Sequence, residues 1–62
     1  MSEEDMHRLK EAVKREQNLV NIFSEVADRL DSKENAEIVH KICKEKQDFI
    51  RLVEEILKIA EA

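Results

Sequence analysis

Apolar residues recur along the first half of the chain at alternating intervals of three and four residues. The inward positions of this repeat are Leu9, Val13, Glu16, Val20, Phe23, Ala27 and Leu30. Such spacing is typical of one face of an α-helix. Ala12, Leu19 and Val26 flank this face and widen it to a stripe that suits a four-helix core. We therefore predict a helix over about residues 3–30, with Ser2 as its N-cap.

The second half of the chain carries the same repeat. Its inward positions are Val39, Ile42, Lys46, Phe49, Val53, Ile56 and Ala60. One side of the repeat is widened by Cys43, Ile50 and Leu57, and the other side by Ile38, Leu52 and Ile59. This pattern predicts a second helix over about residues 34–60.

The chain contains no glycine and no proline, so its turn has to be built from other residues. Asp31 and Ser32 lie between the two repeats, and both residue types prefer to bond the nearby backbone over continuing a helix. Asp31 and Glu34 have capping-box spacing, and Ser32 is an equally good N-cap one residue later. The hinge is therefore expected at about residues 31–33. The prediction is one all-α domain over residues 1–62, a two-helix antiparallel hairpin.

Glu16 and Lys46 are the only charged residues at the inward positions. In an antiparallel hairpin, the numbers of facing residues have a nearly constant sum. Val20 and Ile42 give 62, and Glu16 and Lys46 give 62 as well. A buried charge loses free energy of hydration, and pairing it with an opposite charge largely offsets that loss. We therefore predict a buried or half-buried ion pair between Glu16 and Lys46.

Two helices from a chain of 62 residues cannot close a core, because so short a chain buries only roughly 60% of its unfolded surface. We expect a homodimer that forms a four-helix bundle. Two copies of the ion pair would form a charged layer that fixes the register. The expected dimer core consists of Val13, Val20, Phe23, Ile42, Cys43, Phe49, Val53 and Ile56.

Composition narrows the classes of partner. The formal net charge is −4 and the two phenylalanines are the only aromatic residues, so nucleic acid is not an expected partner. No apolar run approaches the roughly 20 residues of a membrane span. The acidic start and the single Cys43 fit a reducing, cytoplasmic location without an internal disulfide. The expected partner is a second copy of the chain, with another protein as a further option.

His40 and Cys43 are an i, i+3 pair, the spacing at which two side chains can touch on one helix. A Cys–His nucleophile also needs an orienting group, an oxyanion hole and a pocket, which two helices scarcely offer. Glu37 and His40 have metal-ligand spacing, but His40 is expected to face outward. We therefore predict a non-enzymatic chain without a cofactor, in which Cys43 is a small apolar residue at the dimer seam.

The first arm, over residues 12–27, resembles the opening helix of a ferritin-like domain of the rubrerythrin type, in which a glutamate ligand precedes an aromatic residue by seven positions. Glu16 and Phe23 have this spacing. The second arm, over residues 37–57, resembles the following helix, and the resemblance implies half of a four-helix bundle. The Glu-x-x-His positions of that helix align with Lys46 and Phe49, which bind no iron, so the metal site is expected to be degenerate. As an alternative, a di-metal oxidoreductase would use Glu16, Glu45 and Asp48.

The chain also resembles the small RNA-binding hairpin dimers that regulate plasmid copy number, in its length, in Leu30-Asp31 and in Ala36-x-Ile38. This resemblance implies an RNA-hairpin-binding dimer as a second alternative. Those dimers use an aromatic residue on one bundle face, whereas both phenylalanines here fall in the seam. The first expectation therefore remains a structural or protein-interaction module.

Overall fold

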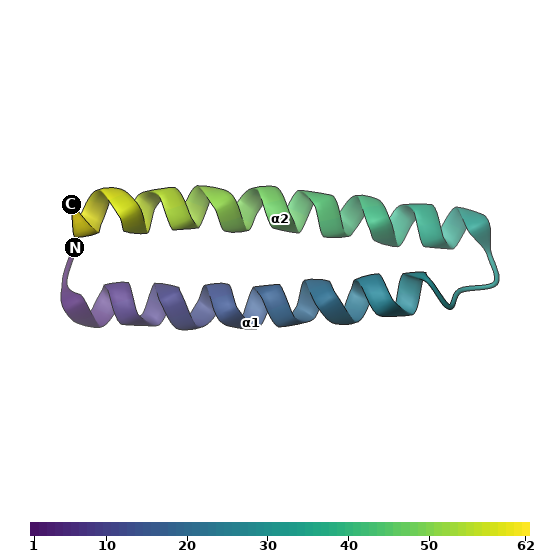
Figure 1. Ribbon diagram of the computed structural model, residues 1–62, viewed down its shortest axis with the longest axis horizontal. Coiled ribbons are helices and arrows are strands. Elements are labelled where there is room, and N and C mark those ends of the chain that lie inside the picture. Colours follow the sequence, from purple (N-terminus) through teal and green to yellow (C-terminus); the bar gives the residue numbers. More distant parts are fainter.

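The computed structural model describes residues 1–62 as two antiparallel helices and no strands. Helix α1 spans Glu3–Ala27 and helix α2 spans Lys33–Glu61. They run side by side over their full length, so that both termini lie at one end and the hinge at the other (Figure 1). The extents of the Cα trace are 46 × 15 × 11 Å. The prediction of an all-α hairpin is confirmed.

Serine side chains begin both helices. The Ser2 hydroxyl accepts a hydrogen bond from the Asp5 N–H at 3.1 Å, and the Ser32 hydroxyl accepts one from the Asn35 N–H at 3.2 Å. Each bond satisfies one of the free N–H groups in the first turn of a helix. Of the two candidate caps for α2, the structure therefore uses Ser32 and not Asp31.

Helix α1 ends at Ala27, three residues before the end that the sequence predicted. The chain tightens there, because the Arg29 N–H donates to the Val26 carbonyl at 3.0 Å and the Leu30 N–H donates to the Ala27 carbonyl at 3.3 Å. Bonds over three residues close a narrower turn than those of an α-helix. No residue has a positive φ, so the hinge needs no glycine. Helix α2 extends one residue beyond the prediction at each end.

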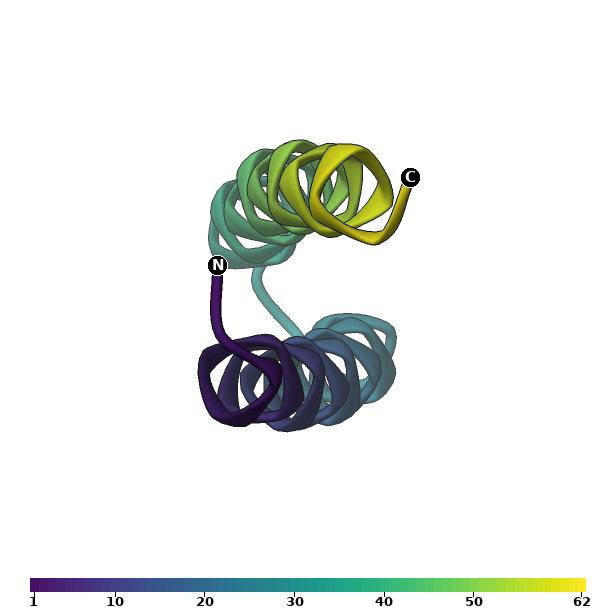
Figure 2. The same cartoon turned by 90° about the vertical axis from the view of Figure 1, so that its left-hand side faces the viewer.

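The seam, along which α1 and α2 contact each other, is narrow. Only five of the 62 residues are buried, and they are Val20, Ala27, Cys43, Ile50 and Leu57. Val13 and Val39 pack against Val20, Cys43 and Ile50 and are partly exposed. The helices cross at a shallow angle when seen end-on (Figure 2), as expected for ridge-into-groove packing.

The rotation of α2 about its axis differs from the prediction. Ile42, Phe49 and Ile56 were expected to face α1, but they are 41%, 57% and 51% exposed. The neighbouring row of Cys43, Ile50 and Leu57 takes that place, and Val20 meets Cys43 and not Ile42. The Cys43 thiol lies 3.8 Å from the Val20 carbonyl oxygen, to which it donates.

On α1, Phe23 and Leu30 were also predicted to point inward but are 39% and 37% exposed. The buried residues of α1 are instead Val20 and Ala27, which belong to the neighbouring row of residues seven apart.

Candidate interaction surface

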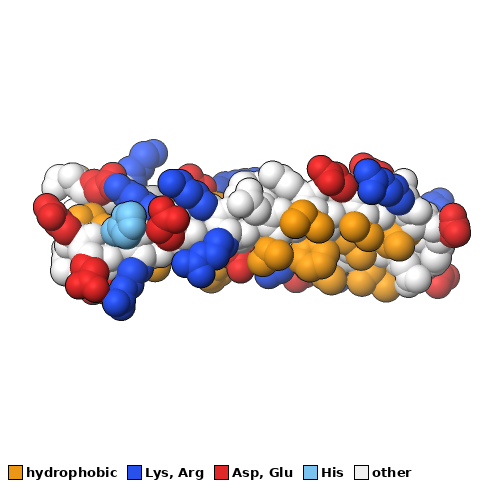
Figure 3. All heavy atoms as spheres, turned by 90° about the horizontal axis from the view of Figure 1, so that it is seen from below, with side chains coloured by type: hydrophobic (Ala, Val, Ile, Leu, Met, Phe, Trp, Pro, Cys, Tyr) orange, Lys and Arg blue, Asp and Glu red, His pale blue; other side chains and the backbone are white.

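Most of the large apolar side chains of the hairpin lie outside the seam. On α1 and the hinge the exposed ones are Leu19, Ile22, Phe23, Val26 and Leu30. On α2 they are Ile38, Ile42, Phe49, Leu52, Ile56 and Ile59. Figure 3, which looks onto α1, shows apolar side chains gathered over the hinge half of the hairpin and charged side chains over the other half. Such a contiguous apolar surface on a small chain marks an interaction site.

Two rows of apolar side chains lie on one face of the hairpin. Residues seven apart lie on the same side of a helix, so Ala12, Leu19 and Val26 form one row on α1, and Ile42, Phe49 and Ile56 form one row on α2. Ala12 and Phe49 line the same small hollow, so the two rows lie on the same face. We call this surface, with the other exposed apolar residues beside it, the apolar face.

The opposite face is polar. Two polar contacts link the helices there, one near each end of the hairpin. Lys10 forms an ion pair with Glu61, and the His40 Nε2 lies 3.6 Å from the Asp28 Oδ1. The Gln17 amide donates to the Asn21 side chain at 3.3 Å on the same face. Side chains of this kind remain hydrated, so the hairpin has one face that is suited to water and one that is not.

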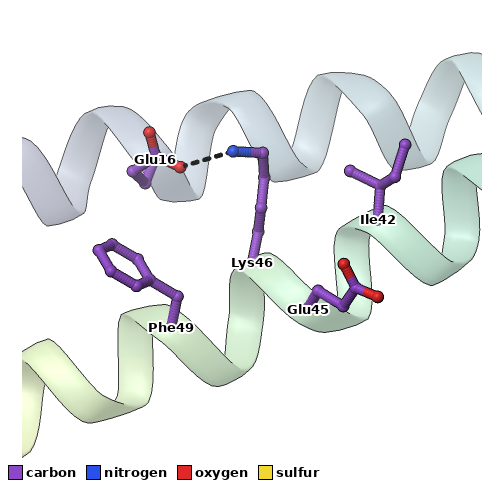
Figure 4. Close-up of a pocket in the computed structure, with 5 residues that line it drawn as sticks. All are labelled: Glu16, Ile42, Glu45, Lys46 and Phe49. Atoms are coloured by element: carbon purple, nitrogen blue, oxygen red, sulfur yellow. Dashed lines mark hydrogen bonds and ion pairs between the residues drawn. The ribbon is translucent and has the colours of Figure 1, made fainter.

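Glu16 and Lys46 meet on the apolar face at mid-length. The Lys46 Nζ donates to the Glu16 Oε2 at 3.2 Å, and the two side chains are 36% and 31% exposed. Lys46 reaches from α2 across to α1, and Ile42 and Phe49 stand on either side of it (Figure 4). The predicted half-buried pair is therefore found in the structure.

Glu45 lines the same hollow as this ion pair. It occupies one position of the row that contains Ile38, Leu52 and Ile59, so it replaces an apolar residue of the face by a carboxylate. Glu45 makes no ion pair of its own. The seven-residue spacing is visible in the sequence, which we interpreted for Glu45 only as part of an alternative metal site.

The residues of the alternative metal site are not brought together. Glu16 and Glu45 share one hollow, whereas Asp48 lines another and lies 3.6 Å from Arg51. No three His, Cys, Asp or Glu side chains lie close enough to one another to hold a metal ion.

His40 and Cys43 also turn to different partners, His40 to Asp28 and Cys43 to the Val20 carbonyl. The side chains that could carry chemistry are thus dispersed. The one polar cluster on the apolar face is the layer of Glu16, Glu45 and Lys46, which we call the central layer.

Comparison with protein-family models, with curated proteins and with solved structures finds no match for this chain. The resemblances to ferritin-like hairpins and to RNA-binding hairpin dimers therefore stay predictions. Neither helix has an apolar stretch long enough to cross a membrane.

Proposed function

We propose that this chain is a non-enzymatic protein-interaction module whose apolar face docks a second copy, giving a homodimeric four-helix bundle. The observation that carries the proposal is the imbalance between the narrow seam and the broad exposed face. Phe49, for example, is 57% exposed on a chain that buries only five residues. Burial of apolar surface contributes roughly 25 cal/mol per Å², so covering this face would add the stability that the seam lacks.

The dimensions of the face suit a second hairpin. The broad side of the hairpin measures 46 × 15 Å between Cα atoms, an area on the order of 700 Å², of which the apolar side chains cover a part. Stable complexes bury about 800 Å² on each partner. Two hairpins packed through their apolar faces would place the polar faces outward, which is the arrangement of a four-helix bundle.

The position of the central layer favours a second copy as the occupant. Glu16 lies 13 residues after the start of α1 and 11 before its end, and Lys46 lies 13 residues after the start of α2 and 15 before its end. The charges are thus near mid-length on both helices. Whether the second copy runs in the same or the opposite direction, full overlap brings one charged layer against the other. Other registers would place charges against apolar side chains, at a cost in free energy.

Sedimentation equilibrium of the whole chain tests this proposal. The expected mass is twice the 7.3 kDa of one chain. Phe49→Glu introduces a charge into the apolar face, and the dimer should dissociate at concentrations at which the unaltered chain remains dimeric. Asn21→Glu introduces the same charge on the polar face and is the matched control, expected to remain dimeric.

Circular dichroism on the same samples shows whether helix is lost together with the dimer, as expected if a single hairpin is marginally stable. An unaltered chain that stays at 7.3 kDa and fully helical at millimolar concentration would refute the homodimer.

A further inference from the structure

Four charged residues lie at mid-length on the apolar face, two of each sign. Glu16 and Lys46 form the ion pair between the helices. Arg15 directly precedes Glu16, and Glu45 directly precedes Lys46. Arg15 and Glu45 are both exposed, and neither takes part in an ion pair of the hairpin. Their charges are therefore free to pair with a second copy.

Arg15 and Glu45 belong to the rows that form the two edges of the apolar face. The edge row of α1 is Arg8, Arg15, Ile22 and Arg29, and that of α2 is Ile38, Glu45, Leu52 and Ile59. The numbers of Arg15 and Glu45 add up to 60, and those of Ile22 and Ile38 do so as well. This sum is close to the 62 of the facing residues Glu16 and Lys46. Each pair therefore lies at nearly the same level along the hairpin, but on opposite edges of the face.

A face-to-face dimer of two hairpins with two-fold symmetry can form in two ways. If both hinges lie at the same end, α1 of each copy packs against α2 of the other. If the hinges lie at opposite ends, α1 packs against α1 and α2 packs against α2. Neighbouring helices are antiparallel in both arrangements, so the direction of the helices does not choose between them.

The charges at mid-length distinguish the two arrangements. With both hinges at one end, Glu16 lies next to Lys46 of the other copy, and Arg15 faces Glu45 of the other copy along each edge of the interface. With the hinges at opposite ends and the helices fully overlapped, each of these charges lies next to the same charge of the other copy. Opposite charges across an interface favour a pairing and like charges disfavour it, so the charges favour hinges at one end.

The apolar residues of the edges have the same preference. Ile22 and Ile38 are 55% and 57% exposed. With both hinges at one end, Ile22 of one copy meets Ile38 of the other. Arg15 is the middle residue of α1, and Arg8 and Ile22 lie seven residues on either side of it. Hinges at opposite ends would therefore place Ile22 beside Arg8 of the other copy, which leaves the isoleucine uncovered by an apolar partner.

We infer that the two copies dock with both hinges at one end, with α1 of each copy packed against α2 of the other, and that Arg15 and Glu45 pair between the copies at both edges. The inference rests on the proposed function, since it describes how the second copy sits on the apolar face. In the resulting ring of four helices, the signs of Glu16 and Lys46 alternate from each helix to the next.

The distance between the two hinges tests this arrangement directly. Asp31→Cys places a thiol at the exposed hinge, and Cys43→Ala in the same chain leaves it as the only site for a nitroxide label. Double electron–electron resonance then measures the separation of the two labels in the dimer. Hinges at one end should give a separation on the order of 20 Å, about two spacings between packed helices. Hinges at opposite ends would separate the labels by most of the 46 Å length of the hairpin.

Charge reversal tests the pairing of Arg15 with Glu45. Arg15→Glu and Glu45→Arg should each raise the dissociation constant of the dimer about tenfold, because each change puts like charges together at both edges. The chain with both changes again has opposite charges at each edge, and its dissociation constant should return to within about threefold of the original. Sedimentation equilibrium measures all three constants.

Lys44→Glu and Glu25→Arg are the matched controls. They make the same charge changes at exposed positions that form no ion pair and line no hollow. Each should change the dissociation constant by less than about threefold. These variants and the charge reversals keep Cys43, so they decide the question even if Cys43→Ala weakens the seam.

A dimer whose hinge labels lie near 46 Å apart would overturn the inference and leave the proposed function standing. Single charge reversals that leave the dissociation constant unchanged would do the same, because in the opposite arrangement they only replace one pair of like charges by another. A chain that stays at 7.3 kDa would refute the proposed function, and the inference with it.

Discussion

The ion pair of the central layer should stabilise the fold by more than a surface pair of similar length. At the observed 3.2 Å and an effective dielectric constant of about 20, the attraction between the two charges is about 5 kcal/mol. Lost hydration and lost side-chain freedom offset most of it, because both groups are about one-third exposed. We expect a net coupling energy of about 1 kcal/mol for each hairpin.

A double-mutant cycle measures this coupling directly. The variants are Glu16→Gln, Lys46→Gln and the two together, and the free energy of unfolding is obtained from urea titrations followed by circular dichroism at one fixed chain concentration. Each single variant leaves the other charge unpaired among apolar side chains, so it should be destabilised by about 1–3 kcal/mol. The double variant should lose less than the sum of the two singles, because no charge is left unpaired.

The exposed pair of Glu4 and Arg8 is the internal control for this cycle. Its nearest atoms are 3.0 Å apart, closer than those of the central pair, but both side chains are about three-quarters exposed. A pair of this kind, one helical turn apart, is worth only about 0.3–0.5 kcal/mol. If the cycle at Glu16 and Lys46 gives no coupling, or no more than the cycle at Glu4 and Arg8, the argument from partial burial is wrong.

Two further predictions concern the hairpin itself. Ser32→Ala removes the hydroxyl that caps α2 and should lower the free energy of unfolding by about 1 kcal/mol in urea titrations, whereas Ser24→Ala, which caps nothing, should change it less. Cys43 is 8% exposed, so its thiol should react slowly with a colourless aromatic disulfide reagent in the folded protein and rapidly in urea; equal rates would show that the seam is open or wrongly rotated.

The amino-acid sequence determined the elements of this protein and their pairing. Helix starts could be read from Ser2 and Ser32, because a serine hydroxyl satisfies the free N–H groups of a first turn wherever the helix then packs. That Glu16 and Lys46 lie opposite each other could also be predicted. In an antiparallel hairpin with one hinge near the middle of the chain, the numbers of two facing residues have a nearly constant sum. These are local or purely topological consequences of the residue order.

Tertiary structure alone decided which apolar row of α2 faces α1. The apolar stripe of α2 is wider than the surface that one neighbouring helix can cover, so periodicity identifies the stripe but not its centre. The centre is set by packing between the helices, which buries Cys43, Ile50 and Leu57 of α2 together with Val20 and Ala27 of α1. That choice leaves Ile42 and Phe49 on the outer face, on either side of the central layer. The exposed apolar face is therefore a product of the contact between the helices, and it could not be read from either helix alone.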